Sequence, residues 1–388
     1  MRILASDGME KNAVAALRAQ GHEVVEQFYE PAELAEQVKN FDVLVVRSAT
    51  KVRVPIIDAA CETGKLKLII RGGVGIDNID HKYAEEKGIK VMNTPRASSD
   101  AVAELAMAHM LSCARFISVA GHTMREGKWE KKAYKGIEIH GKTLGIVGFG
   151  RIGQALGRMA KGMGMNVIAF DIFHIPGIEE QTGINYVEMD ELLAKSDFIS
   201  VHAPAVDGGA IINAANIAKM KDGVRILNFA RGGLVNSGDI KAALEAGKVS
   251  CYVTDFPDAS VIGVENIIAI PHLGASTPES EDNCAVMAAK ELKAYIENGN
   301  VINSVNFPCV SEPRTTDVRI CVLHKNVPNM INHISAILGD KNINIEHFSN
   351  KSRGDIAYSI IDVAGTAPDD TEDVISAIDG VIKVRIIK

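Results

Sequence analysis

The sequence predicts an α/β protein with two doubly wound parallel-sheet domains and, after them, a small βαββαβ module. Short apolar segments alternate with helical patterns over residues 2–94 and again over residues 143–270, as in successive βα units. Residues 317–388 then follow the order strand, helix, strand, strand, helix, strand. A chain of 388 residues is long enough for two or three domains, each with its own core.

The composition is that of an ordinary globular protein and excludes several classes of function. Hydrophobic residues make up 47% and charged residues 23%, and the net charge of −7 offers no positive surface for nucleic acid or an acidic membrane. No apolar run reaches the roughly 18 residues that span a bilayer, and we interpret residues 1–10 as a buried strand rather than a signal peptide. The six cysteines are scattered, so we expect reduced thiols, no metal and a cytoplasmic protein.

Three strand ends in the first domain carry chemically suggestive residues. Arg47 and Ser48 follow one predicted strand, residues 72–75 (GGVG) follow the next, and Asn93 ends a third. Ligands of parallel sheets bind at these carboxyl ends. The backbone N–H groups of residues 72–75 could form a small anion-binding nest, or the glycines could simply serve a tight turn that needs φ > 0.

A dinucleotide fingerprint opens the second domain. An apolar strand (Thr143–Val147) turns through GFGRIG at residues 148–153 into a helix, and a second strand (Asn166–Phe170) ends at Asp171. Gly148 permits the tight turn, Gly150 lets a pyrophosphate approach the backbone, and Gly153 lets helix and strand pack closely. The helix N-terminus favours phosphate. Because Asp171 can accept hydrogen bonds from ribose hydroxyls and would repel a 2′-phosphate, we expect NAD rather than NADP. A glycine-rich structural turn is the alternative.

Later strand ends of the same domain supply a cation and a histidine. An oxidoreductase that works beside nicotinamide needs a cation for an anionic substrate and a group that exchanges the hydroxyl proton. Arg231, in NFARGG, can grip a carboxylate with its planar guanidinium. His272, before LGAST, suits general acid and base catalysis, although a lone histidine is more often a buried structural residue. His202 also ends a strand, where we expect it to shape a turn near the adenosine half.

The remaining segments set the expected domain boundaries. We expect one long helix over residues 98–118, a polar segment over residues 121–140 that carries Trp129, Lys131 and Lys132, and a return strand over residues 301–305. For those lysines a solvated loop is the favoured interpretation. Residues 306–316 have two prolines and no periodicity, which is typical of a linker. The expected domains are residues 1–97 with 283–306, residues 98–282 and residues 317–388, with a linker at 307–316.

The motifs VGFGRIGQALGRMAKGMGMNVIAFD, NFARGGLVN, IPHLGAST and GGVGIDNID together resemble the D-2-hydroxyacid dehydrogenases, most closely the phosphoglycerate dehydrogenases with a C-terminal ACT domain. The resemblance implies a flavodoxin-like substrate domain, a Rossmann NAD domain and hydride transfer to NAD. Arg231 would bind the substrate, which the resemblance implies is 3-phosphoglycerate, and His272 would be the acid and base. The resemblance further implies that the substrate is held by Arg47, Ser48, Gly73, Val74, Gly75, Asn93, Lys131 and Lys132. It implies that the cofactor is held by Gly148, Gly150, Arg151, Ile152, Gly153, Asp171, His202, Ala203, Pro204, Ala230, Asp255 and Gly274.

One departure from the family pattern concerns the partner of His272. The family places a glutamate shortly after the strand that ends here at Asp255, where it orients the catalytic histidine. In this chain the segment reads TDFPDASVIG and holds no glutamate. Asp258 is the nearest replacement, with Glu265 as a second possibility, and Asp255 is expected to serve the nicotinamide carboxamide. Without any partner, the pKa of His272 would fall.

The final module resembles the serine-binding ACT domain, which has a ferredoxin-like fold. The family pattern of His, Asn and a downstream Asn falls on His324, Asn326 and Asn344, so L-serine is the expected allosteric effector. Asn329 stands where the family has a glycine and can adopt the same left-handed conformation. The resemblance implies a homodimer or homotetramer. Two alternatives stay open, namely another D-2-hydroxyacid dehydrogenase of glycerate or hydroxypyruvate type, and a non-enzymatic NAD-sensing protein similar to corepressors of this fold.

Overall fold

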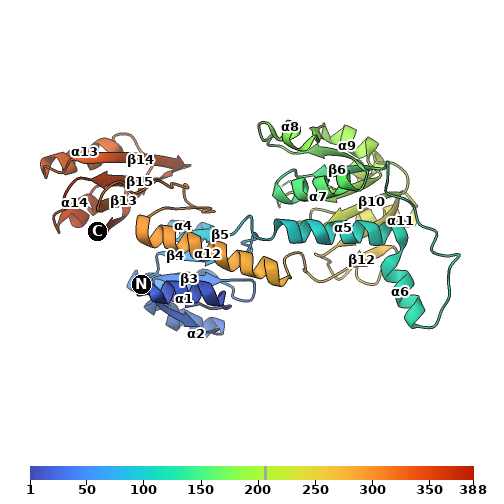
Figure 1. Ribbon diagram of the computed structural model, residues 1–388, viewed down its shortest axis with the longest axis horizontal. Helices are drawn as coiled ribbons and strands as arrows, with labels where there is room; N and C mark the ends of the chain where they lie inside the picture. The colour runs from blue at the N-terminus through green and yellow to red at the C-terminus, as the bar shows by residue number, and fades with distance from the viewer. Residues whose placement is uncertain (205–207) are drawn as a thin grey trace. The chain divides into compact units, whose positions relative to one another are not determined.

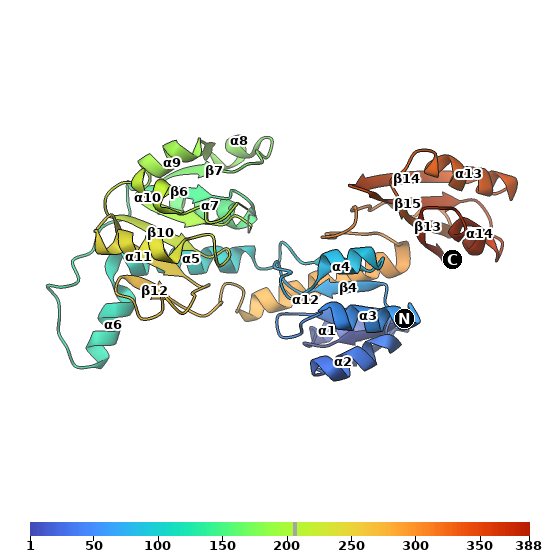
Figure 2. The ribbon, with the colours of Figure 1, turned by 180° about the vertical axis from the view of Figure 1, so that it is seen from behind.

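The computed structural model describes residues 1–204 and 208–388, and the chain divides into two compact units. Unit 1 consists of Met1–Ala97 and Pro278–Lys388, and unit 2 consists of Ser98–Thr277. Figures 1 and 2 show the elements of each unit from opposite sides. The sequence-based boundary after residue 97 coincides with this division, whereas the return to the first unit occurs at Pro278 rather than at residue 283.

The first sheet of unit 1 is fully parallel, with the strand order β2-β1-β3-β4-β5. This is the flavodoxin-like, doubly wound order that the sequence predicts. Its strands other than the edge strand β2 are nearly all buried, as expected for a parallel sheet with helices on both faces. The strands are β1 (Arg2–Ala5), β2 (Glu23–Glu26), β3 (Val43–Val46), β4 (Leu68–Arg71) and β5 (Lys90–Asn93), and the helices are α1 (Lys11–Ala19), α2 (Pro31–Gln37), α3 (Val54–Thr63) and α4 (His81–Glu86).

The helix α12 (Pro278–Asn298) leads the chain back into unit 1, but the expected return strand is absent. Only an isolated bridge joins Ser304 to Met92, and Asn303 has a φ of 53°, which a strand does not accommodate. At this edge of the sheet the side chain of Asn306 forms backbone hydrogen bonds of the kind that a neighbouring strand would form. Its Oδ1 accepts from the N–H of Val91 at 2.9 Å, and its Nδ2 donates to the carbonyl of Ile89 at 2.9 Å.

The expected linker is packed rather than extended. Phe307 and Val310 are fully buried in a hydrophobic cluster that also contains Leu68 of the first sheet, Leu292 of α12 and Leu323 of the C-terminal module. The segment that contains Phe307 and Val310 is therefore packed, unlike the extended linker predicted over residues 307–316. Single apolar residues separated by prolines and polar residues give no periodic signal, although their burial joins the module to the first sheet.

The C-terminal module is the predicted βαββαβ fold. Its four strands are antiparallel in the order β14-β15-β13-β16. A buried ion pair between Arg319 and Asp362 anchors it, because the same guanidinium donates to the carbonyls of Asn298 and Pro313 at 2.9 and 2.7 Å. The elements are β13 (Val318–Lys325), α13 (Met330–Asp340), β14 (Ile345–Arg353), β15 (Ile356–Val363), α14 (Thr371–Ser376) and β16 (Val381–Ile387).

Unit 2 contains a parallel seven-stranded sheet with the order β12-β11-β10-β9-β6-β7-β8. The order reverses at β6, which is the switch point where ligands of such sheets bind. The strands are β6 (Thr143–Val147), β7 (Asn166–Phe170), β8 (Asn185–Tyr186), β9 (Phe198–Val201), β10 (Val224–Asn228), β11 (Val249–Thr254) and β12 (Ile267–Ala269). The helices between them are α7 (Arg151–Gly162), α8 (Ile178–Thr182), α9 (Met189–Lys195), α10 (Ala214–Ala218) and α11 (Ser237–Glu245).

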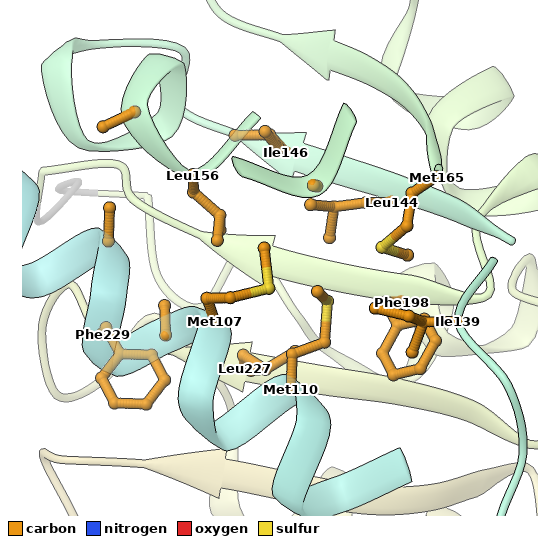
Figure 3. Packing of buried hydrophobic residues seen from close by; sticks show 14 of the residues in the cluster. Met107, Met110, Ile139, Leu144, Ile146, Leu156, Met165, Phe198, Leu227 and Phe229 are labelled. Carbon is orange, nitrogen blue, oxygen red and sulfur yellow. The ribbon is translucent and has the colours of Figure 1, made fainter. Parts of the chain in front are cut away.

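Two helices replace the single helix expected over residues 98–118. The helix α5 (Ser99–Arg115) ends at Phe116, whose φ of 56° breaks the helix, and α6 (Ile117–Arg125) follows at a bend of 67°. In Figure 3, Met107 and Met110 of α5 point into the core against Leu144, Leu156 and Leu227 of the sheet layer. None of the residues of α6 is buried.

No single helix within residues 1–204 and 208–388 has both the length and the apolar character needed to cross a membrane. The bent pair formed by α5 and α6 meets that test by length and composition only.

Candidate active site

Each glycine of the GFGRIG turn occupies a position that a side chain would disturb or obstruct. Gly148 has a φ of 93°, and a Cβ there would lie 2.6 Å from the backbone of His202 and Ala203. A Cβ on Gly153 would lie 2.4 Å from the carbonyl oxygen of Gly148. A Cβ on Gly150, by contrast, would point into open space, where the pyrophosphate of a dinucleotide can approach the N-terminus of α7. The turn therefore fits the cofactor that the sequence predicts.

Asp171 lies beside this turn, as the sequence predicts. Its Oδ2 accepts from the N–H of Phe149 at 2.7 Å, and its Oδ1 accepts from the N–H of Phe173 at 3.1 Å. These two bonds fix the carboxylate at the end of β7, and each oxygen keeps a lone pair for a ribose hydroxyl. The backbone N–H groups of Phe149 and Phe173 thus hold the carboxylate that we expect to select NAD.

His202 packs behind the glycine turn rather than projecting from it. Its Nε2 lies 2.8 Å from the hydroxyl of Ser200, and burial lowers its pKa to about 4, so the ring is neutral at physiological pH. Its backbone N–H donates to the carbonyl of Val147 at 2.7 Å. These contacts support the interpretation that His202 shapes the turn.

Arg231 and His272 both lie close to one aromatic ring, that of Phe256. The ring of His272 lies 4.2 Å from that of Phe256, and the guanidinium of Arg231 lies 5.6 Å from it. One guanidinium nitrogen, Nη1, also donates to the carbonyl of Ala230 at 2.7 Å. Sequence reasoning missed Phe256, although its position directly after Asp255 at a strand end was a usable signal. A cation for a carboxylate and a histidine for a proton are thus held in one cluster.

Asp255 is a buried carboxyl group at the end of β11. Burial raises its pKa to about 6, while the backbone N–H groups of Asp255 and Gly274 and the charge of Arg231 partly offset that effect. Its Oδ1 has no hydrogen-bond partner among the described residues. The carboxyl group therefore connects the strand end to the loop that carries His272 and retains an unused acceptor.

The carboxylate of Asp258 accepts hydrogen bonds from two serines. Its Oδ2 accepts from the hydroxyl of Ser237, and its Oδ1 accepts from the N–H of Ser260 at 2.7 Å. These bonds lower its pKa and connect it to Ser237, the first residue of α11, and to the turn that follows Asp258. The structure thus gives the carboxylate two serine partners, and its role as a replacement for the missing glutamate stays a prediction.

The three strand-end loops of unit 1 are joined into one network. Asn93 donates to the carbonyl of Val74 at 2.6 Å, and Asn78 donates to the carbonyls of Arg47 and Thr50 at 2.7 Å. Asp7 accepts from the N–H of Arg47 at 2.6 Å. Sequence reasoning singled out Arg47, Val74 and Asn93 but missed Asp7 and Asn78, whose roles depend on neighbouring strands.

Gly73 shows why the glycine-rich loop needs glycine. Its φ is 149°, and a Cβ there would collide with the guanidinium of Arg71. The close approach of Arg71, which sequence reasoning did not single out, places a second cation beside the loop. The positive φ favours glycine here, whereas the guanidinium ends a flexible side chain and can move aside; the arginine adds positive charge where an anion-binding loop is expected.

Arg47 is paired with an acid in this structure. Its Nη2 lies 2.6 Å from Oε1 of Glu281, and both residues line a cavity of about 210 Å³ together with Asp7 and Glu10. A substrate anion would therefore compete with Glu281 for the guanidinium. Lys131 and Lys132, by contrast, are exposed in a turn of unit 2, as the solvated-loop interpretation expects.

The three residues expected to bind serine do not converge within one module. His324 is opposite Ala357 at one end of the sheet, and both its ring nitrogens are engaged, by the carbonyl of Lys325 and the hydroxyl of Ser359. Asn344 lies at the other end, where its carbonyl accepts from the N–H of Ala364. His324 and Asn326 can share a ligand with Asn344 only if Asn344 comes from another copy.

The fold and this cluster define an oxidoreductase of the parallel-sheet, dinucleotide-binding class. Residues 107–274 match the family described as D-isomer specific 2-hydroxyacid dehydrogenase, NAD binding domain. The chain is also 44% identical over 304 residues to hydroxypyruvate reductase of Thermotoga maritima, across 75% of this chain and 97% of that protein. The chain belongs to the D-2-hydroxyacid dehydrogenase family and is an NAD-dependent enzyme of that kind.

Two further comparisons refine the similarity. D-3-phosphoglycerate dehydrogenase 1 of Saccharomyces cerevisiae is 32% identical over 403 residues, across 96% of this chain and 84% of that protein. Among solved structures, a glyoxylate reductase from Paecilomyes thermophila superposes with a TM-score of 0.70 at 30% identity, across 79% of this chain and 98% of that chain. These relatives belong to the same family, but their names refer to different substrates.

Proposed function

We propose that this enzyme oxidises 3-phosphoglycerate to 3-phosphohydroxypyruvate with NAD, which is the first step of L-serine biosynthesis. The extent of the similarity carries the proposal. The yeast protein named D-3-phosphoglycerate dehydrogenase aligns across 96% of this chain and therefore includes the C-terminal module, whereas the hydroxypyruvate reductase aligns across 75%. The free state of all six cysteines agrees with the cytoplasmic location expected for such an enzyme.

Two residues of unit 2 have separate tasks in the reaction: one binds the charged substrate and the other transfers the proton. Bound NAD supplies the acceptor for the hydride. Arg231 binds the carboxylate of the substrate through a bidentate contact that also fixes the carbon to be oxidised. His272 takes the proton of the hydroxyl group during oxidation and returns it during reduction. Asp255 offers its unused Oδ1 as the acceptor for the carboxamide of the nicotinamide.

The loops of unit 1 are assigned to the anionic groups of the substrate. Arg47, with Ser48, the backbone of residues 73–75 and Asn93, would hold carboxylate and phosphate oxygens. Arg47 must exchange Glu281 for the substrate, and this exchange favours a doubly charged phosphate over a neutral hydroxyl. Lys131 and Lys132 are proposed only as a source of added charge.

Hydroxypyruvate reduction is the second candidate, because the relative with that name has the higher identity of 44%. The discriminating experiment compares kcat/KM of the purified full-length chain for 3-phosphoglycerate and D-glycerate with NAD at alkaline pH. The reverse direction is tested with 3-phosphohydroxypyruvate and hydroxypyruvate. A preference for the unphosphorylated pair would refute the phosphoglycerate proposal and support the second candidate.

Two variants localise the phosphate preference. Arg47→Gln should lower kcat/KM for 3-phosphoglycerate by about 10-fold or more and should lower that for D-glycerate much less, because a charged contact is worth about 1.5–3 kcal/mol. Lys51→Gln removes an exposed cation from the same loop and serves as the matched control. If kcat/KM fell equally for both substrates, Arg47 would not be the residue that recognises the phosphate.

Regulation by L-serine and assembly into a homodimer or homotetramer form part of the proposal. On α6, Ile117, Val119 and Met124 are exposed, as is Trp129 in the segment that follows, and such a patch is typical of an interface. The separation of His324 and Asn326 from Asn344 requires a second copy for a shared serine site. Light scattering should therefore show an oligomer, and serine should raise the thermal midpoint of the wild-type chain but not of Asn344→Ala.

A further inference from the structure

A cavity of about 260 Å³ in unit 1 lies between the first sheet and the C-terminal module, apart from every residue assigned above to substrate, cofactor or serine. Lys67 and Lys90 line it from the first sheet, and Lys383 and Arg385 line it from β16. Glu372 is the single carboxylate among the lining residues. The cavity therefore holds an excess of positive charge that is contributed by both parts of the unit.

Lys90 is the most unusual of these cations. The residue is only 4% exposed. Its ammonium lies over the rings of Tyr358, Phe307 and Tyr295, at 5.0, 5.6 and 5.7 Å from their centroids. Within residues 1–204 and 208–388 the structure gives this ammonium neither an ion pair nor a hydrogen bond. Burial, together with the charges of Lys383 and Arg385, lowers its pKa to about 7. The aromatic rings compensate only part of the lost hydration.

The neighbouring cations do not relieve this imbalance. Arg385 donates to the carbonyls of Tyr295, at 2.7 Å, and Ile296, so it caps the end of α12 while its side chain also lines the cavity. Lys383 is partly buried, and its pKa is lowered by burial and by Lys67. Buried charges in native structures are normally paired, yet among the described residues no ion pair joins Lys90, Lys383 or Arg385 to Glu372 or to another carboxylate.

We propose that this cavity is a binding site for a phosphate-type oxyanion, either inorganic phosphate or the phosphate group of a small metabolite. A doubly charged tetrahedral anion offers acceptor oxygens in several directions, which matches ammonium groups that approach from different elements. The volume of this cavity is slightly smaller than that of pockets for drug-sized ligands, which is about 300–1,000 Å³, so the occupant is small. Because the cations come from both the first sheet and the module, the anion stabilises their packing.

The test uses the full-length chain and isothermal titration calorimetry at pH 6.5, at an ionic strength held constant with sodium chloride. The probes are inorganic phosphate and glycerol 2-phosphate. We expect one of them to bind to the wild type, and Lys383→Gln and Lys90→Met to weaken that binding by about tenfold or more, since each removes a charged contact. Lys383→Gln alters a partly exposed side chain and should fold normally, which keeps the test valid if Lys90→Met does not.

Two control variants separate this site from other phosphate binding. Lys351→Gln removes an exposed lysine of β14 outside the cavity, and Arg47→Gln removes the cation assigned to the substrate. Both should retain the affinity of the wild type for the probe. Binding of inorganic phosphate supports a free anion as the occupant, and binding of glycerol 2-phosphate alone supports a phosphorylated metabolite. Absence of binding with both probes, equal affinity in all variants, or loss only in Arg47→Gln would overturn the proposal.

Discussion

Glu291→Gln should stabilise the protein at pH 8 and leave it almost unchanged at pH 5. Glu291 of α12 is 3% exposed, its Oε1 accepts from Asn303 at 2.6 Å, and its Oε2 has no partner among the described residues. Burial raises its pKa from 4.5 to about 7, and the hydrogen bond from Asn303 offsets part of that effect. The folded state therefore holds more protons than the unfolded state between those values, so stability falls as the pH rises through this window.

The magnitude follows from that difference in pKa. At about 1.4 kcal/mol for each pH unit, the cost above pH 7 is about 3 kcal/mol. The amide keeps the oxygen that accepts from Asn303 and cannot ionise, so Glu291→Gln should recover most of this energy. For a unit of this size, the thermal midpoint should rise by about 6–12 °C at pH 8 and by less than about 2 °C at pH 5.

Differential scanning calorimetry of the full-length chain at both pH values measures this effect. NAD binds unit 2, so the transition of unit 1 is identified as the one that NAD shifts less. Glu279→Gln, an exposed glutamate in the first turn of the same helix, is the control and should give no gain at pH 8. An equal response of the Glu291 variant at pH 5 and pH 8 would refute the argument from burial.

Three further changes test the site of unit 2. Gly153→Val should destabilise the protein by about 1–3 kcal/mol and weaken NAD binding, because even a Cβ would lie 2.4 Å from the Gly148 carbonyl; unchanged NADH fluorescence titrations would contradict this. Asp171→Asn should raise the ratio of kcat/KM for NADP to that for NAD about tenfold or more, and a constant ratio would show that the carboxylate does not select the cofactor. Asp258→Asn should leave the pH profile of kcat/KM unchanged, because the carboxylate of Asp258 accepts hydrogen bonds from two serines. If the acid limb of that profile shifted in the variant, Asp258 would instead be the partner of His272.

The parts of the site that sequence reasoning located are those defined within one βα unit. The positions of Gly148, Gly153 and Asp171 follow from a strand, a turn and a helix that are contiguous in the chain, and their roles in cofactor binding stay predictions. Phe256, which joins Arg231 to His272, and Asn78, which joins two loops, act through neighbours from other strands. Such partners are set by the sheet order and leave no local pattern.

Burial that depends on distant segments was likewise not predictable. Lys90 begins an apolar strand and gives no sign that rings from three other segments enclose its ammonium. The segment around Phe307 has prolines and polar residues, so its pattern indicates a linker although the structure buries it. In both cases the outcome depends on how the C-terminal module packs on the first sheet.

The packing of the first sheet against the final third of the chain has a consequence for synthesis on the ribosome. Unit 2 is continuous in the chain and can fold as soon as it has emerged. The first sheet cannot do so, because the cluster around Leu68 includes Leu292, Phe307 and Leu323, and the edge of β5 is closed by Asn306. One apolar face of the nascent N-terminal segment therefore stays without its native partners while all of unit 2 is translated.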